Sequence, residues 1–298
     1  MRATPAAATG IDPDGRGGGA ALRRLHVAGA PLVVPNAWDA ASARMIEAAG
    51  FPVVATSSAA MAAVLGHDDG ERAPVSEVLA AAARIVRAVR VPVTIDFERG
   101  YGLAPAELVE RFAATGAAGL NLEDSHPASG DMIDVAEQAD FLSAVREAAV
   151  AQGADLVINA RTDLFLRRSG PAREQVAGTL ARGARYLEAG ADCVYPIGAA
   201  DPEVIRALAE GLPGPVNVAY GNGRLSLARL AELGVARVSF GPALQRHLYD
   251  TFGSVMLPAV ASDRTPFTRW RHACMQPGPG PAASPPVKSS IGESDERG

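Results

Sequence analysis

Two acidic residues, Asp96 and Glu98, interrupt the apolar run VTIDFERGYG at residues 93–102. In an extended strand, residues two apart project from the same face, so these two carboxylates would lie side by side. Like charges at that separation repel each other, and a bound cation would relieve the repulsion. The pair therefore predicts a metal site, and the alternative is that these acids only cap a following helix.

Polar residues also follow the other short apolar runs of the chain. Three acids from neighbouring strands, facing one cavity, would need a cation, and hard oxygen ligands favour Mg²⁺, with Mn²⁺ as a possible substitute. We expect Asp124 to cap the following helix instead, and Asp39 to cap the helix that starts beside it. The polar residues that follow the runs are Asn36, Thr56, Ser57, Ser58, Glu123, Asp124, Arg161, Asp163, Asn217 and Tyr220.

Short β-like runs alternate with stretches of helical period along the chain. Several of the helical stretches end in glycine, as AAG, ATG, EAG or ELG, which is typical of a helix C-terminus. We expect strands at 31–36, 53–57, 91–96, 119–124, 156–161, 193–198, 215–220 and 236–241, and helices at 39–49, 75–89, 104–115, 134–151, 173–189, 201–210 and 225–233.

Eight βα units without a break in composition predict one α/β domain, a closed (β/α)₈ TIM barrel over residues 21–272. An open doubly wound sheet is the alternative fold. In a barrel, polar residues at the carboxyl ends of the strands belong to the active-site face, which is where these residues fall. Segments 1–20 and 273–298 are rich in Gly, Pro, Ala or Ser, and we expect both to be disordered.

Composition excludes several classes of function. The only lysine of the chain, Lys288, lies in the C-terminal segment, so a Schiff-base aldolase has no suitable amine. The net charge is −5 and the arginines are scattered, which argues against a nucleic-acid partner and for a small-molecule substrate. No membrane span or secretory signal is recognisable, so we expect a cytoplasmic protein. Cys193 and Cys274 lack the spacing of a disulfide framework or a zinc site.

Five motifs at successive strand ends carry a family resemblance. ATSSAA (55–60), LGHDDG (65–70), TIDFERGYG, GLNLEDS and INARTD appear in this order within residues 30–245. Together they resemble the isocitrate lyase and phosphoenolpyruvate mutase superfamily, and in particular its branch similar to 2-methylisocitrate lyase and oxaloacetate decarboxylase. The resemblance implies a metal-assisted reaction on a 2-oxo acid through an enolate.

The resemblance also implies a role for each matching residue. Asp96 matches the family's metal-ligating aspartate, and Glu98 and Glu123 match the acids that hold metal-bound waters. Asp69 matches the aspartate of a mobile gating loop. The substrate's acid group would be held by Ser57 with the amides of Ser58 and Ala59, and by Arg161, and we add Asn217 to the predicted substrate-binding residues.

One loop departs from the family pattern. Members that cleave isocitrate or methylisocitrate carry a Lys-Cys-Gly-His type motif after strand four, where this chain reads SHPASGDMI (125–133). Without that lysine and cysteine these cleavages lose their proton donor. The lysine and asparagine of phosphonate-forming mutases are also missing from the loop. His126 is our candidate acid or base there, against the alternative of a solvated loop histidine.

We therefore expect a Mg²⁺-dependent lyase or decarboxylase that acts on a small 2-oxo dicarboxylate. Two alternatives stay open: phosphorus–carbon chemistry of the phosphoenolpyruvate mutase type, and a catalytically silent barrel that binds a metabolite. The resemblance further implies a homo-oligomer, a dimer of dimers in which the helix after strand eight is exchanged between subunits.

Overall fold

The computed structural model describes residues 18–167, 170–221 and 225–262. Contacts divide the chain into two compact units, residues 1–248 and residues 249–298. The strands and the candidate site all lie in the first unit. The expected disordered ends fall mostly outside the described residues, but residues 18–20 belong to a helix.

Short parallel strands follow one another in the order expected of a barrel. They form two sheets, one with the order β2-β3-β4-β5-β6-β7 and one with the order β1-β9-β8, and a parallel bridge between Val194 and Val216 joins β7 to β8. The strands are β1 (Leu32–Val34), β2 (Asn36–Ala37), β3 (Val54–Thr56), β4 (Val93–Asp96), β5 (Gly119–Glu123), β6 (Val157–Thr162), β7 (Cys193–Pro196), β8 (Asn217–Ala219) and β9 (Arg237–Ser239).

Each of the eight predicted strand runs overlaps a strand, and the first overlaps two. Pro35 separates β1 from β2, because proline has no N–H to donate to a sheet ladder. The two halves pair with different neighbours: Val33 is in register with Val238 of β9, and Asn36 is in register with Ala55 of β3. The first strand run thus connects the two sheets, and the barrel class is confirmed although the ladder is not one closed sheet.

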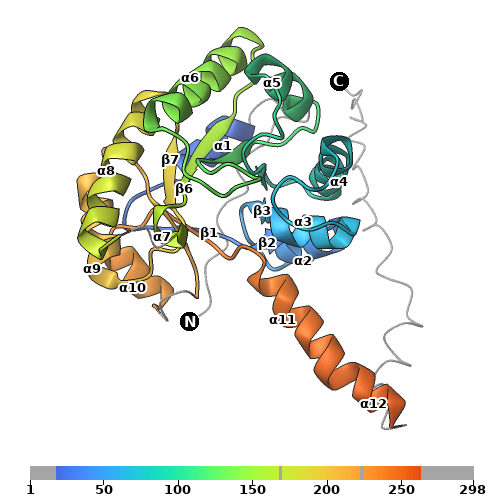
Figure 1. The fold of residues 1–298 in the computed structure, drawn as a ribbon. Coiled ribbons are helices and arrows are strands. Elements are labelled where there is room, and N and C mark those ends of the chain that lie inside the picture. The colour runs from blue at the N-terminus through green and yellow to red at the C-terminus, as the bar shows by residue number, and fades with distance from the viewer. Residues whose placement is uncertain (1–17, 168–169, 222–224, 263–298) are drawn as a thin grey trace, which may run out of the picture. The chain divides into compact units, whose positions relative to one another are not determined.

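Helices surround the strands, and Figure 1 shows α4, α5, α6, α8, α9 and α10 around them. The seven predicted helices are all present, whereas α1, α3 and α7 were not predicted. The helices of the first unit are α1 (Gly18–Arg24), α2 (Ala40–Ala48), α3 (Ser58–Leu65), α4 (Val75–Ala88), α5 (Pro105–Ala113), α6 (Val135–Ala151), α7 (Leu164–Arg167), α8 (Ala172–Glu188), α9 (Pro202–Gly211) and α10 (Leu227–Glu232). A further helical stretch, α11 (Ala243–Thr251), a π-helical turn (Phe252–Met256) and α12 (Leu257–Ala261), runs across the division into the second unit.

Local sequence explains where several helices begin and end. Asp39 caps α2 as predicted. Its carboxylate accepts a hydrogen bond from the backbone N–H of Ser42, and the Ser42 hydroxyl oxygen accepts one from the backbone N–H of Asp39. The glycines of the four sequence patterns adopt the left-handed conformation that favours glycine after a helix. Their φ angles are 88° at Gly50, 79° at Gly116, 98° at Gly190 and 84° at Gly234.

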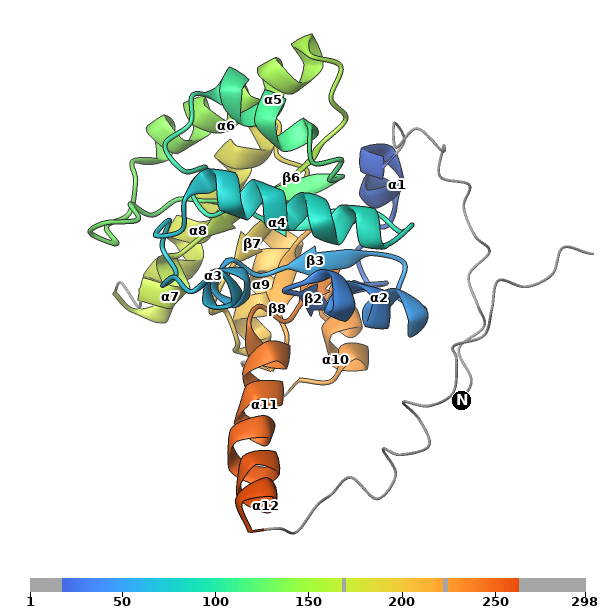
Figure 2. The ribbon, with the colours of Figure 1, turned by 90° about the vertical axis from the view of Figure 1, so that its right-hand side faces the viewer.

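The main core lies between the strands and the helices. On α4, Val78, Leu79, Ala82 and Ile85 are buried, a spacing that places them on one face of the helix. That face packs against Val93 and Ile95 of β4 in one core cluster, and Figure 2 shows α4 along its length. No described helix has the length and apolar character that crossing a membrane requires.

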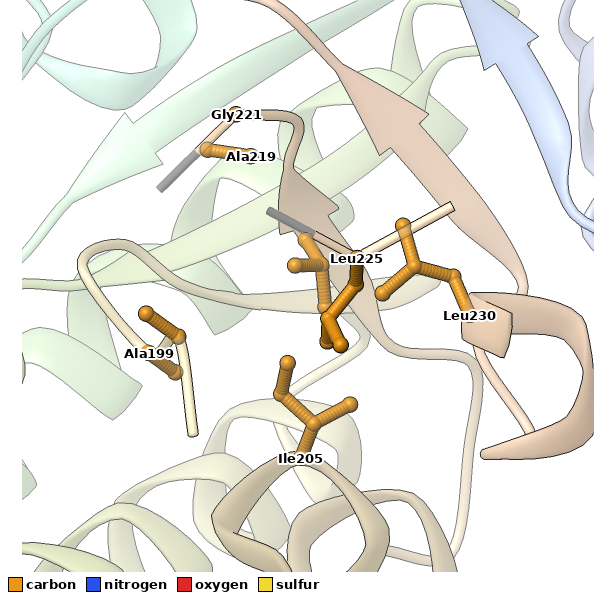
Figure 3. A pocket seen from close by; sticks show the side chains of 8 residues that line it. Ala199, Ile205, Ala219, Gly221, Leu225 and Leu230 are labelled. Atoms are coloured by element: carbon orange, nitrogen blue, oxygen red, sulfur yellow. The ribbon is translucent and has the colours of Figure 1, made fainter. Parts of the chain in front are cut away.

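A small apolar cavity lies beside β8 (Figure 3). Its volume is about 10 Å³, enough for roughly one water molecule. Ile205 of α9 and Leu230 of α10 point into it, and no charged side chain lines it. It is a packing gap behind the strand, not a substrate site.

Candidate active site

Asp96 ends β4 at the centre of the predicted site. Its Oδ2 accepts two hydrogen bonds from Ser58, the first residue of α3: one from the backbone N–H and one from the hydroxyl, each 3.1 Å long. Thr56 Oγ1 accepts from the backbone N–H of Asp96 at 3.0 Å, which fixes the strand end. The helix N-terminus that we predicted to bind substrate therefore binds Asp96.

A chain of amide side chains supports the other oxygen of Asp96. Asn121 on β5 donates its Nδ2–H to Asp96 Oδ1 at 3.3 Å. Asn159 on β6 donates in turn to Asn121 Oδ1 at 2.8 Å. All three side chains lie on neighbouring strands, so the orientation of Asp96 is set across three strands.

Asp69 lies in the gate loop, which we define as residues 66–74 between α3 and α4. It shares the single hydroxyl hydrogen of Ser58 with Asp96 and accepts a hydrogen bond from the Gly70 backbone, and it is close enough to Asp96 and Arg161 to feel their charges. Partial burial raises the pKa of Asp69, and the neighbouring Asp96 raises it further. The structure thus brings Asp69 beside Ser58 and Asp96.

Glu98 is buried just beyond β4, with an exposed fraction of 4%. Its Oε2 accepts the backbone N–H of Glu71 at 2.6 Å, and its Oε1 accepts the Tyr101 hydroxyl. Burial raises the pKa of Glu98 to about 7, and the charges of Asp69 and Asp96 add to the rise. Both carboxylate oxygens are therefore engaged by the chain, a feature that the sequence motif did not reveal.

Glu123 and Arg161 form a buried ion pair at the ends of β5 and β6. Glu123 Oε2 lies 2.6 Å from Arg161 Nη1. Asp163 binds the same guanidinium through two bonds, 2.7 Å to Nε and 3.1 Å to Nη2. These carboxylates raise the pKa of Arg161, which keeps it a cation. Arginine has five N–H donors, and contacts with described residues engage three of them, at Nη1, Nε and Nη2.

The prediction that Asp124 caps a helix is wrong. The cap of α6 is Asp134, which accepts from the N–H groups of Ala136 and Glu137. Asp124 is fully buried and binds Arg182 Nη1 at 3.1 Å and the Tyr186 hydroxyl at 2.8 Å, both on α8. The nine residues between Asp124 and Asp134 form a loop, so Asp124 is too far along the chain to cap α6.

That loop contains His126. A β-bridge between Ser125 and Met132 makes the loop a small hairpin, and the His126 backbone bonds to Asp131 and Gly130 across it. The His126 side chain is exposed. Within the described residues, no hydrogen bond or ion pair joins this side chain to the site, so its catalytic role stays a prediction.

The remaining predicted substrate residues have structural partners. Ser57 caps α3, accepting from the Ala60 N–H at 3.4 Å. Asn217 is fully buried on β8 and bonds to the Ser239 hydroxyl of β9 at 3.3 Å. Arg237, two residues before Ser239, was not singled out in the sequence because it precedes the strand end. It is 1% exposed, and its Nε and Nη1 have no partner among the described residues.

The acidic residues fit a hard divalent cation by their chemistry. In the described ranges, no three His, Cys, Asp or Glu side chains converge closely enough to ligate one ion jointly. That arrangement is compatible with Asp96 as a direct ligand, and with Glu98 and Glu123 acting through water. Burial raises the pKa of Glu123, the Arg161 charge opposes the rise, and the charges of Asp163, Asp96 and Glu98 add to it.

Fold and site together define a parallel (β/α)₈ barrel enzyme with an acidic site at the carboxyl ends of β4, β5 and β6. The family model described as phosphoenolpyruvate phosphomutase matches residues 22–257. The chain belongs to this family, within the isocitrate lyase and phosphoenolpyruvate mutase superfamily of lyases and mutases.

The similar proteins include both lyases or decarboxylases and a proposed phosphonomutase. The chain is 36% identical over 236 residues to the oxaloacetate decarboxylase of Pseudomonas fluorescens SBW25, covering 74% of this chain and 78% of that protein. It is 43% identical to a proposed phosphonomutase of known structure from Burkholderia cenocepacia J2315, with a TM-score of 0.77 and coverage of 80% and 98%. A 2,3-dimethylmalate lyase of the superfamily is 26% identical, with a TM-score of 0.72 and coverage of 82% and 86%.

Proposed function

We propose that this protein is a Mg²⁺-dependent decarboxylase or carbon–carbon lyase that acts on a small 2-oxo dicarboxylate such as oxaloacetate. The observation that carries the proposal is the group formed by Asp69, Asp96 and Glu98: three acids at one strand end, none of them in an ion pair among the described residues. The similarity to an oxaloacetate decarboxylase supports the choice of substrate.

Asp96 would hold the metal directly, and Glu98 and Glu123 would hold its water ligands. When bound, Mg²⁺ supplies positive charge that polarises a 2-oxo group and stabilises negative charge on its oxygen. Glu98 must release its proton to take this role, and the cation would lower its raised pKa.

The chain's own residues would bind and orient the substrate. Two N–H groups of Arg161 would bind a carboxylate, with Glu123 and Asp163 fixing the plane of the guanidinium. Ser57 and the Ala59 amide at the N-terminus of α3 would bind an acid group in the field of the helix, while the Ser58 amide binds Asp96. For oxaloacetate, the bond between C3 and C4 breaks, CO₂ leaves, and its electron pair stays on C3, which then takes a proton to give pyruvate.

The test is turnover of oxaloacetate by the full-length protein with Mg²⁺, measured as pyruvate. Oxaloacetate also loses CO₂ slowly without enzyme, so the rate with an Asp96→Asn protein serves as the background. Turnover above this background supports the proposal. Turnover of phosphonopyruvate and none of oxaloacetate would reverse it.

The second candidate is phosphonomutase chemistry. The 43% identity to a proposed phosphonomutase favours it, as does the name of the matching family. The loop 125–133 argues against it, since it contains no lysine or asparagine. Calorimetry distinguishes both candidates from a silent barrel: no Mg²⁺ binding, or binding unchanged by Asp96→Ala, would favour the silent barrel.

We also propose that the protein is a cytoplasmic homo-oligomer, a dimer of dimers. Large apolar side chains of the last helical stretch are exposed, among them Leu248 and Phe252, at 53% and 51%. A subunit contact would bury such side chains. Sedimentation equilibrium tests this, and a monomer at micromolar concentration would refute it.

A further inference from the structure

Three non-glycine residues in the described part of the chain have left-handed backbones. Their φ angles are 60° at Glu71, 49° at Glu98 and 56° at Tyr101. Each such conformation costs about 1–3 kcal/mol and persists only where surrounding contacts impose it. Glu71 belongs to the gate loop, and the other two follow β4, yet all three meet in one hydrogen-bonded group.

Glu71 and the segment 98–101 exchange hydrogen bonds in both directions. The Glu71 backbone N–H donates to Glu98 Oε2 at 2.6 Å. The Glu71 side chain accepts at Oε1 from the backbone N–H groups of Arg99, at 3.1 Å, and Tyr101, at 2.6 Å. Tyr101 closes the group by donating its hydroxyl to Glu98 Oε1. We call this group the latch, made of Glu71, Glu98, Arg99 and Tyr101.

The latch fixes the loop that carries Asp69. Asp69 is two residues before Glu71, and it bonds to Ser58 at the N-terminus of α3. The side-chain bonds of Glu71 run to backbone amides after β4, whereas Asp69 faces Asp96. Gly70, between them, lies against the loop 125–133: a side chain there would meet the Pro127 carbonyl oxygen at 3.8 Å. Holding Glu71 in place therefore holds Asp69 over the site.

We propose that Glu71 is a positioning residue that keeps the gate loop closed and delivers Asp69 to the site. Glu71 acts through Asp69 and through exclusion of water, not on the substrate. This role rests on the proposed function, because the closed loop is useful only if a substrate lies beneath it. The signal in the sequence was the acid in DDGE, one residue beyond the motif LGHDDG.

Amide hydrogen exchange of the metal-free, full-length protein tests the latch without any activity. In Glu71→Ala the amides of Arg99 and Tyr101 lose their acceptor, so we expect them to exchange at least about 10-fold faster, with amides of β6 unchanged. Glu71→Gln keeps one acceptor oxygen, so its exchange rates at Arg99 and Tyr101 should lie between those of the wild type and Glu71→Ala. Glu147→Gln is the matched control, since Glu147 is an exposed glutamate on α6, outside the gate loop, that accepts from the Ser143 hydroxyl at 3.2 Å. Unchanged exchange in Glu71→Ala overturns the proposal.

Kinetics then test the consequence of the latch. We expect kcat of Glu71→Ala to fall about 10-fold or more while the Mg²⁺ affinity, measured by calorimetry, changes less than about 3-fold. If Glu71 only stabilised the fold, its replacement would lower the melting temperature without lowering kcat more than the Mg²⁺ affinity. Faster exchange with an unchanged kcat would overturn the positioning role. If the wild-type protein turns over no 2-oxo acid, the proposed function fails, and the exchange data still decide whether the latch exists.

Discussion

Two groups of acids at the same end of the barrel differ in what balances their charge. Asp124 is bonded to Arg182, to the Tyr186 hydroxyl and to the backbone N–H of Asp163. Asp96 and Glu98 have only neutral donors, such as Ser58 and Tyr101, and within the described residues neither has a cationic partner. Both groups are at strand ends, and the sequence shows both simply as acids after apolar runs.

The difference separates an acid whose charge the chain balances from two acids whose charge it does not. Burial raises the pKa of Asp124, but Arg182 and two other donors oppose the rise. For Glu98 the charges of Asp69 and Asp96 work in the same direction as burial. Arg182 neutralises Asp124, so this acid can stabilise the fold without any further cation. Asp96 and Glu98 are in no ion pair among the described residues, and a cation from outside would relieve their repulsion.

The largest expected effect, and the strongest test of the difference between Asp96 and Asp124, comes from removing the charge of Asp96. We expect Asp96→Asn to lose Mg²⁺ binding and about 10³-fold in kcat/KM, roughly 4 kcal/mol, because the direct metal ligand is gone. Calorimetry and the pyruvate assay measure the two effects. Asp134→Asn, a change at an exposed helix cap, is the control. A variant that binds Mg²⁺ normally would contradict the assignment.

The same change at Asp124 should act on stability instead. Asp124→Asn leaves Arg182 partly buried without a counter-charge, which we expect to lower the free energy of unfolding by about 3 kcal/mol. Urea denaturation measures this, and Mg²⁺ affinity should stay as in the wild type. A loss of Mg²⁺ affinity with unchanged stability would show that the two groups have the opposite roles.

The pH dependence of stability follows from the raised pKa of Glu98. Its ordinary value is 4.5 and its folded value about 7, so between these pH values the folded state holds a proton that the unfolded state has released. Stability of the metal-free protein should therefore fall as pH rises through this window, by about 2–3 kcal/mol. Urea midpoints from pH 4.5 to 8 test this. Added Mg²⁺ should flatten the slope, and a rise with pH would contradict the sign.

The smallest expected effect concerns the Tyr101 hydroxyl. Its hydrogen bond lowers the pKa of Glu98 against the effect of burial. Tyr101→Phe should lower the free energy of unfolding by about 1 kcal/mol near neutral pH. It should also raise the pKa of Glu98 further, so the pH range in which stability falls should extend to higher pH. Unfolding curves at several pH values measure both quantities. Tyr249→Phe, at an exposed site, is the control, and an unchanged window would show that this hydroxyl does not act on Glu98.

The sequence predicted the barrel well because its signals are local. Apolar runs, helical periods and the glycines at 50, 116, 190 and 234 each depend on residues a few positions apart, and the structure has the corresponding elements. The helices α1, α3 and α7 escaped prediction. α3, the Ala-rich stretch SAAMAAVL, has no polar face that would mark a helical period.

The candidate site could be predicted only in part. The residue types of Asp96, Asp69 and Arg161 and their places after strands were visible in the motifs, and the structure brings them into electrostatic contact. The partners were not visible. Nothing in the spacing of Asp124 and Arg182, which are 58 residues apart, indicates that they meet, and the pairing of Glu71 with the segment 98–101 spans about half that separation.

By itself, the sequence determined which chemistry is available: strand-end carboxylates, one arginine for an acid group, and no lysine for a Schiff base. Only the tertiary structure decided which of these carboxylates form an ion pair with an arginine of the chain and which do not. The physical reason is that the pKa of a buried carboxylate depends on charges and donors within a few ångströms, and those come from distant parts of the chain. Asp124 and Asp96 look alike in sequence and differ because Arg182 reaches only one of them.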